Sequence, residues 1–104
     1  MAAVNVLAIF RPKPGSYDAV LENLRSVIPR VHEEEGCELY AITDDRNGVI
    51  VMLEKWSSEA LLDAHGDGQP VADLNAANEG LLLGPVEVTR LDPIPVGDAR
   101  KGAL

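Results

Sequence analysis

Nearly every residue is apolar over residues 4–10, in the first part of the chain. One side of this segment carries Val4, Val6, Ala8 and Phe10, and the other side carries Leu7 and Ile9. A period of two with apolar residues on both sides is typical of a β-strand that is buried on both faces. Pro12, Pro14 and Gly15 follow, and they predict that the strand ends there.

The next segment has the spacing of three and four residues that marks one face of a helix. Its apolar positions are Tyr17, Val20, Leu21, Leu24, Val27, Ile28 and Val31. Ser16 precedes them and is a suitable N-cap residue. Pro29 cannot donate a hydrogen bond to the carbonyl of Arg25, so we expect a bend or a loosened last turn there. The helix is predicted to end near Glu34.

Two strands joined by a tight turn are predicted next, over residues 37–43 and 49–56. The turn between them contains Asn47-Gly48, a pair that is typical of hairpins. In the second of these strands, one face carries Val49, Val51 and Leu53, and the other carries Ile50, Met52, Glu54 and Trp56. This strand is therefore also largely apolar on both faces.

A second helical region and a last strand complete the pattern. Ser57 or Ser58 can cap the helical region, which is interrupted at residues 66–70 and resumes over 71–78. Gly84-Pro85 then opens a fourth strand, over residues 86–91. Residues 93–104 contain two further prolines, and we expect an extended C-terminal tail there rather than a helix.

The order strand, helix, strand, strand, helix, strand predicts an α+β, ferredoxin-like βαββαβ domain over residues 1–92. Both helical regions would cover one face of a four-stranded antiparallel sheet. The other face would leave a contiguous apolar patch in water, and such patches usually mark an interface. We therefore expect a homodimer in which two sheets pack face to face.

Composition narrows the class of function. A chain of 104 residues has room for one domain, and 9 basic against 17 acidic side chains give a net charge of −8. This charge repels phosphate backbones and anionic lipid headgroups, so we expect no nucleic-acid or membrane partner. Cys37 is the single cysteine and cannot form an intrachain disulfide. Together with an N-terminus that lacks the features of a secretory signal, this predicts a cytoplasmic protein.

The two histidines differ in their surroundings. His32 lies among Glu33, Glu34 and Glu35 at a polar helix end and is interpreted as a solvated surface residue. His65 closes a helical segment nine residues after Trp56, so a strand end and a helix end can converge there on one pocket. Two readings of His65 stay open: a functional imidazole, or a cap on the helix C-terminus, which favours a positive charge.

Few other side chains offer chemistry. Trp56 is either a core or interface anchor or a pocket wall, and Glu54 on an apolar face needs a hydrogen-bond partner or a raised pKa. Acidic neighbours would raise the pKa of Cys37, which is interpreted as a packed strand residue. No metal site is predicted. The residues together predict an apolar pocket near Tyr40, Met52, Trp56 and His65 that suits a flat aromatic or lipophilic ligand.

Several short motifs occur in a characteristic order. They are E-x-G-C-x-x-Y at residues 34–40, E-x-W at 54–56 and Ala64-His65, together with Phe10 and Lys13-Pro14-Gly15. These motifs resemble those of the antibiotic biosynthesis monooxygenase family of dimeric α/β-barrel proteins. The segment 93–102 resembles the tail of actinobacterial monooxygenases of that family. The resemblance covers essentially the whole chain, and the order of the motifs makes it more specific than any one of them.

The resemblance implies a homodimer with one pocket per subunit, which oxygenates a quinol or phenolic substrate with dioxygen and without metal or flavin. It implies His65 and Trp56 as catalytic residues, with Trp56 shaping the pocket and His65 or Glu54 handling the proton. Phe10, Tyr40, Met52 and Glu54 are the expected substrate-binding residues. In such a pocket the protein binds the substrate anion and stabilises charge, and the substrate itself passes an electron to dioxygen.

Three positions depart from the family pattern. Quinone-forming members have an asparagine where this chain has Met52, and a tyrosine where it has Leu61 or Leu62. Haem-degrading members have an asparagine on the first strand, where this chain has Ala8, which argues against haem degradation. Two hypotheses follow: a cofactor-independent monooxygenase, or a non-catalytic binding protein or isomerase-like enzyme that uses the same pocket.

Overall fold

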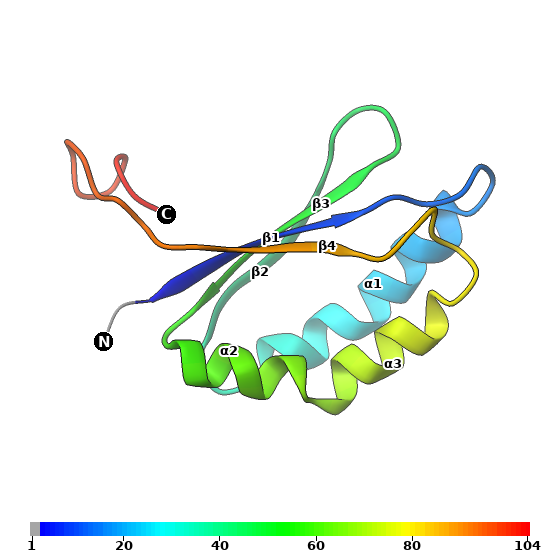
Figure 1. Cartoon of the computed structure of the whole chain (residues 1–104), viewed down its shortest axis with the longest axis horizontal. Helices are drawn as coiled ribbons and strands as arrows, with labels where there is room; N and C mark the ends of the chain where they lie inside the picture. Colours follow the sequence, from blue (N-terminus) through cyan, green and yellow to red (C-terminus); the bar gives the residue numbers. More distant parts are fainter. Residues whose placement is uncertain (1–2) are drawn as a thin grey trace.

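The computed structural model describes residues 3–104 and has the predicted α+β architecture (Figure 1). The elements in chain order are β1 (Val4–Phe10), α1 (Tyr17–His32), β2 (Cys37–Asp44), β3 (Ile50–Trp56), α2 (Glu59–Gly66), α3 (Gln69–Ala77) and β4 (Glu87–Leu91). The strands form one antiparallel sheet in the order β2-β3-β1-β4. The ferredoxin-like fold is thus confirmed, with the interrupted helical region present as two helices.

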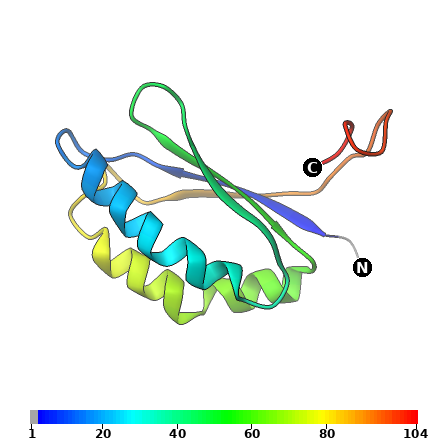
Figure 2. The same cartoon turned by 180° about the vertical axis from the view of Figure 1, so that it is seen from behind.

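All three helices lie on the same side of the sheet, and no element covers the other side over the described residues (Figures 1 and 2). The register places Ala8 opposite Met52 on β3 and opposite Val88 on β4. Paired residues share a face, so the rows of β1 and β3 that begin at Val4 and Ile50 face the helices. This agrees with the division into two faces that the alternation predicted.

Local signals explain most of the element boundaries. The Ser58 hydroxyl accepts a hydrogen bond from the Leu61 N–H at 3.2 Å and caps α2, as expected. Ser16 occupies the N-cap position of α1, but its side chain makes no capping bond, and its carbonyl accepts from the Val20 N–H instead. Helix α1 continues through Pro29 and ends at His32. Asp67 and Gly68 separate α2 from α3, and Pro70 lies in the first turn of α3, where a proline is tolerated.

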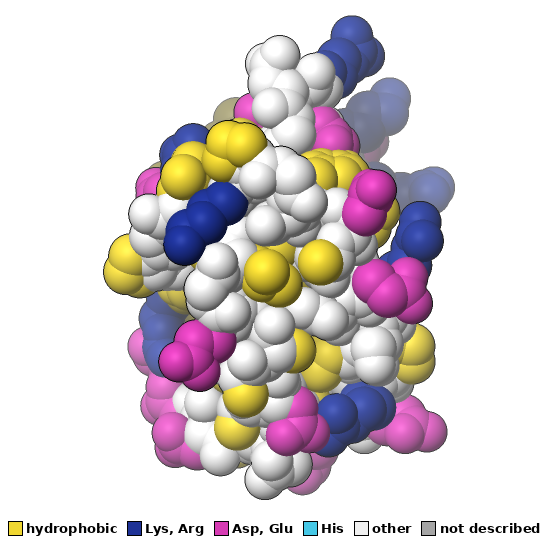
Figure 3. Space-filling view, turned by 90° about the vertical axis from the view of Figure 1, so that its right-hand side faces the viewer, with side chains coloured by type: hydrophobic (Ala, Val, Ile, Leu, Met, Phe, Trp, Pro, Cys, Tyr) yellow, Lys and Arg dark blue, Asp and Glu magenta, His cyan; other side chains and the backbone are white. Residues whose placement is uncertain are grey.

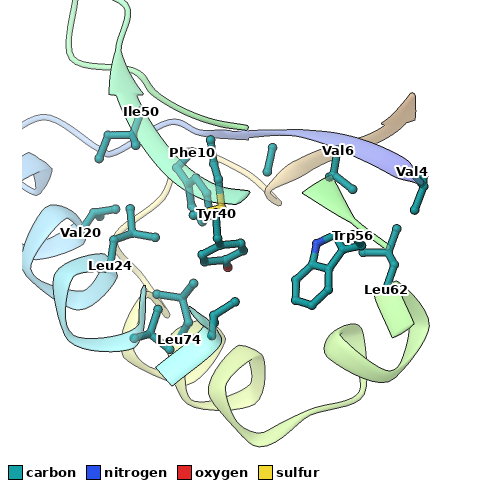
Figure 4. Packing of buried hydrophobic residues seen from close by; sticks show 14 residues of the cluster. Val4, Val6, Phe10, Val20, Leu24, Tyr40, Ile50, Trp56, Leu62 and Leu74 are labelled. Atoms are coloured by element: carbon teal, nitrogen blue, oxygen red, sulfur yellow. The ribbon is translucent and has the colours of Figure 1, made fainter. Parts of the chain in front are cut away.

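The core lies between the sheet and the helices (Figure 4). Its buried apolar members are Val4, Val6, Ala8, Phe10, Val20, Leu24, Val27, Val31, Tyr40, Ile50, Met52, Trp56, Leu62 and Leu74. Four of them come from α1 at the spacing predicted for its apolar face. Only two come from α2 and α3, so the helical layer packs tightly along α1 and less tightly along the other two helices.

Gly36 sets the distance between the α1–β2 turn and the start of α2. Its φ of +85° is unfavourable for other residues, and a Cβ there would lie 2.6 Å from Leu61 Cδ1 and 2.9 Å from Ser57 Oγ. The Gly36 carbonyl accepts a hydrogen bond from the Ser57 N–H at 2.9 Å. A glycine is therefore required for this close approach, which brings Glu34 beside α2.

The C-terminal tail leaves the sheet after β4 and contains no helix. It is extended over residues 93–96, as expected, but then folds into a turn in which Gly102 N–H donates to the Asp98 carbonyl at 2.8 Å. The Asp98 carboxylate accepts from the N–H groups of Arg100 and Lys101, which stabilises the turn. The expectation of a fully extended tail is thus wrong for its last residues.

The surface mixes charged and apolar side chains. Figure 3 looks at the right-hand side of Figure 1 and shows small hydrophobic groups interspersed with acidic and basic side chains. Within residues 3–104, the helices are too short or too polar for any of them to cross a membrane.

Candidate functional site

A cavity of about 360 Å³ lies between the sheet and the pair α2 and α3. Its lining residues are Val6, Ala8, Phe10, Tyr40, Glu54, Leu62, His65, Gly66, Val71, Leu74, Asn75, Val86, Val88 and Arg90. Four of the sequence-predicted site residues are among them: Phe10, Tyr40, Glu54 and His65. The volume lies in the range of small-molecule sites, and most of the lining is apolar.

Met52 and Trp56, by contrast, do not line this cavity. Both side chains are 0% exposed, because they lie on the helix-covered face of β3 and helices cover them completely. The structure therefore places Met52, a predicted substrate-binding residue, in the core beside the cavity and not in its lining. Trp56 contacts the site indirectly, through the two polar side chains that it touches.

Trp56, His65 and Tyr40 form one aromatic cluster. The Trp56 and His65 rings are stacked, with centroids 4.4 Å apart and planes at 29°. Tyr40 presents its ring edge-on to both, with centroid distances of 5.3 Å to His65 and 6.5 Å to Trp56. Figure 4 shows Tyr40 and Trp56 projecting from the sheet toward the helices. The strand end and the helix end thus converge as the sequence predicted.

Glu54 is a buried carboxylate with one direct partner. Its Oε1 accepts a hydrogen bond from Trp56 Nε1 at 2.9 Å, and its side chain also lines the cavity. Burial raises the pKa of Glu54, while the Trp56 hydrogen bond and nearby His65 act in the opposite direction. The sequence predicted either a hydrogen-bond partner or a raised pKa for Glu54, and Trp56 is the partner that the structure provides.

His65 lies between two carboxylates. Its Nδ1 is 2.8 Å from Glu34 Oε1, and its Nε2 is 3.9 Å from Glu54 Oε1, which is too long for a direct hydrogen bond. The residue is 7% exposed. The ring therefore points into the fold, and the helix-cap reading does not describe it. Sequence reasoning missed Glu34 as a site residue, although Glu34 is the first residue of the E-x-G-C motif.

The hydroxyl of Tyr40 is a poor acid in this setting. Burial is the main cause that raises the pKa of Tyr40, and the negative charges of Glu54 and Glu34 raise it further. Tyr40 therefore stays protonated and can donate a hydrogen bond, but it does not supply a phenolate.

Arg90 stands at the rim of the cavity, and sequence reasoning also missed it. Its guanidinium lies 2.9 Å from Glu59 Oε1 and 2.7 Å from Asp63 Oδ1, so it links β4 to α2. Because two carboxylates already neutralise this cation, it leaves no net positive charge at the rim for an anionic ligand. The largely apolar cavity thus suits a neutral molecule better than an anionic one.

The remaining candidates lie elsewhere. His32 is exposed, with Nε2 3.0 Å from the Tyr40 carbonyl oxygen. The pKa of Cys37 is raised as expected, although burial is the largest cause and the charge of Glu34 comes second. Among residues 3–104, no three His, Cys, Asp or Glu side chains are grouped so that they could hold a metal ion.

Comparison with known proteins adds independent findings. The model of the family described as "Antibiotic biosynthesis monooxygenase" matches residues 3–77. The chain is 31% identical over 97 residues to "Putative monooxygenase Rv0793" of Mycobacterium tuberculosis, covering 92% of this chain and 96% of that protein. It is 39% identical over 74 residues to "Probable quinol monooxygenase YgiN" of Escherichia coli, covering 60% of this chain and 71% of that protein.

Solved structures agree with these relatives. The structure of Rv0793 superimposes with a TM-score of 0.84 at 30% identity, covering 93% of this chain and all of that one. The structure of PA3566 from Pseudomonas aeruginosa gives a TM-score of 0.82 at 25% identity, covering 90% of this chain and 96% of that one.

Proposed function

Because the chain belongs to the antibiotic biosynthesis monooxygenase family, we propose that it oxygenates a small quinol or phenol with dioxygen in the cavity beside His65. The observation that carries this proposal is the imidazole of His65, which lines the apolar cavity, with its Nδ1 at Glu34 and its Nε2 on the side of Glu54, a second lining residue. A relative with 39% identity over 74 residues is described as "Probable quinol monooxygenase YgiN", which supports the substrate class.

The substrate would lie with its ring against the apolar walls and its hydroxyl toward His65. Phe10, Leu62 and Leu74 contribute such walls, and the Tyr40 hydroxyl and the Glu54 carboxyl group supply hydrogen-bonding groups. The gap of 3.9 Å between His65 Nε2 and Glu54 Oε1 leaves that nitrogen free to meet a substrate hydroxyl.

His65 Nε2 then accepts the hydroxyl proton. The resulting anion is electron-rich and can pass an electron to dioxygen, and the imidazolium is stabilised between the two glutamates. A quinol that takes up one dioxygen yields the hydroxyquinone and one water, so the substrate supplies all the electrons. No external reductant is required by this balance, and the protein binds, orients and moves a proton.

The polar groups of this cavity differ from the asparagines that the sequence analysis noted in other family members. This chain has Met52 where quinone-forming members have an asparagine and Ala8 where haem-degrading members have one, and Met52 is fully buried. The polar residues that line the cavity are Tyr40, Glu54, His65, Asn75 and Arg90. Of these, the imidazole of His65 is best suited to accept a proton near neutral pH, which supports its role as the proton acceptor.

We also propose that two chains form a homodimer through the open face of the sheet. That face carries a row of half-buried aliphatic side chains, namely Leu7, Ile9, Val51 and Leu53. Burial of such a row against a second copy removes it from water and is favourable in proportion to its area.

Oxygen uptake with a panel of quinols and anthrones tests the reaction. We expect turnover with at least one of them, and His65→Ala should lower it by about 10² or more, which is typical for loss of a general base. His32→Ala removes the exposed histidine and is the matched control, with unchanged turnover. Equal turnover of His65→Ala and the wild type would contradict the role of His65.

The isomerase-like alternative uses the same proton acceptor and is distinguished by the same assay. Conversion of a substrate at full rate under nitrogen would favour proton transfer without oxygenation. Tight binding of a quinol with no conversion would favour a binding protein.

A further inference from the structure

We infer that Glu34 is the positioning residue for His65, which fixes the ring so that Nδ1–H points outward and Nε2 faces the cavity. This inference rests on the proposed function for its role in turnover, but the orientation of the ring can be tested without any substrate. Glu34 lies on the turn after α1, outside the cavity lining, and would act only through the imidazole.

The neighbours of His65 restrain the ring in different ways. Stacking on Trp56 and the edge of Tyr40 restrict the plane of the ring. Neither contact distinguishes the two nitrogens, because aromatic contacts do not depend on which nitrogen carries the proton. The 2.8 Å contact between Nδ1 and Glu34 Oε1 is the one close polar contact that does.

This contact determines the tautomer of the neutral ring. A carboxylate only accepts hydrogen bonds, so the ring must carry its proton on Nδ1 to bond with Glu34. The lone pair is then on Nε2, the nitrogen on the cavity side. When Nε2 accepts the substrate proton, the Glu34 charge stabilises the imidazolium, as the orienting carboxylate does in other catalytic pairs of this kind.

A second observation concerns the other oxygen of Glu34. Its Oε2 is buried and has no hydrogen-bond partner among the described residues. An unpaired buried carboxylate oxygen is costly and calls for an explanation. A role of the Glu34 carboxylate in orienting His65 would explain why it is retained although the packing supplies no donor for its second oxygen.

The outer side of the His65 ring borders a separate depression of about 270 Å³. Glu34, Leu61, Ala64, His65 and Pro70 are among its lining residues. His65 is therefore the residue shared by this depression and the cavity. Removal of the Glu34 carboxylate would enlarge the depression beside Nδ1, where a small carboxylate such as formate can bind in its place.

Nitrogen NMR of the imidazole rings tests the orientation directly. The chain has only two histidines, so His32→Gln identifies the His65 signals. At a pH where the ring is neutral, we expect the Nδ1–H tautomer to dominate in the wild type and in Glu33→Ala, an exposed neighbouring control. Glu34→Ala should shift the population toward Nε2–H, and formate should restore it. An unchanged tautomer in folded Glu34→Ala would overturn the inference.

Turnover then tests the consequence for the reaction. Glu34→Ala should lower kcat at least 10-fold with little change in KM, and formate should recover part of the loss. Glu34→Gln keeps a carbonyl acceptor for Nδ1–H but removes the charge, so its kcat should lie between those of Glu34→Ala and the wild type. Full kcat in Glu34→Ala would refute the positioning role. Lack of turnover in the wild type would count against the proposed function alone, and the tautomer measurement would still decide the role of Glu34.

Discussion

Along β3, successive side chains alternate between the helix-covered face of the sheet and the open face, and the two rows differ in burial. Ile50, Met52, Glu54 and Trp56 on the covered face are at most 6% exposed. Val51, Leu53 and Lys55 on the open face are only partly buried. The side chains of β3 are therefore fully packed within the chain on the helix-covered face and only partly packed on the open face.

The polar groups of the two faces differ as well. On the covered face, Glu54 bonds with Trp56 and lies beside His65, so its polar atoms form a connected cluster. On the open face, Asn5 is 3% exposed and its amide nitrogen has no partner among the described residues. This contrast is the reason why the proposed reaction is assigned to the covered face and the proposed dimer contact to the open face.

The largest expected effect comes from a charge on the covered face. Met52→Arg should abolish cooperative unfolding, because an unpaired charge in the core costs a large part of the free energy of unfolding of a small domain. Chemical denaturation followed by tryptophan fluorescence measures this. Met52→Leu conserves volume and should cost less than about 1.5 kcal/mol. A folded Met52→Arg protein would show that the core around β3 is open to water.

Trp56→Ala should have the next largest effect, on stability and on the site together. Truncation of a buried tryptophan typically costs about 3–5 kcal/mol. The same change removes the stacking partner of His65 and the donor to Glu54. Thermal unfolding followed by circular dichroism measures the first effect, and substrate titration measures the second. Trp56→Phe keeps much of the packing but removes the N–H that donates to Glu54. If Trp56→Phe loses as much substrate affinity as Trp56→Ala, the lost hydrogen bond to Glu54 is the cause.

Val51→Arg places the same charge one residue away, on the open face. In a single chain the guanidinium can reach water, so the free energy of unfolding of the monomer should change little. In a face-to-face dimer two such charges would be buried together, and the protein should sediment as a monomer at micromolar concentration. Val51→Thr, of similar shape and without charge, should remain a dimer. A wild type that sediments as a stable monomer would contradict the dimer proposal.

The sequence predicted the strands and their faces well, because alternation in 4–10 and 49–56 is a local property. The Ser58 cap and the break at 66–70 are also local signals. The turn at residues 98–102 was missed, since its hydrogen bonds arise from the folded tail and are not visible as periodicity.

The site was predicted only in part, for a physical reason. Whether a side chain on the covered face lines the cavity depends on how closely the helices approach each strand position. Met52 and Glu54 are neighbours on the same face of β3, two residues apart. Met52 is nevertheless fully buried in the core, whereas Glu54 borders the cavity. Glu34 contacts His65, 31 residues away in the sequence, and Arg90 contacts Asp63, 27 residues away. No local pattern in the sequence encodes such contacts.

The smallest effect concerns the pH dependence of stability on the covered face. Burial raises the pKa of Glu54 in the folded chain above its unfolded value. The folded state thus holds this proton more tightly, so its contribution to stability is present below the unfolded pKa and is lost as pH rises through the folded one.

Glu54→Gln mimics the protonated form and keeps an oxygen acceptor for Trp56 Nε1. Its free energy of unfolding should therefore fall less than that of the wild type between about pH 4 and the neutral range, since model glutamates titrate near pH 4.3. Urea denaturation across this range measures the difference, and other titrating groups cancel because both proteins contain them. Glu79→Gln, at an exposed glutamate, should follow the wild-type curve. If Glu54→Gln also follows it, the Glu54 carboxylate is stabilised by Trp56 and His65 as fully as water would stabilise it, and the contrast in polarity between the two faces is weaker than burial alone indicates.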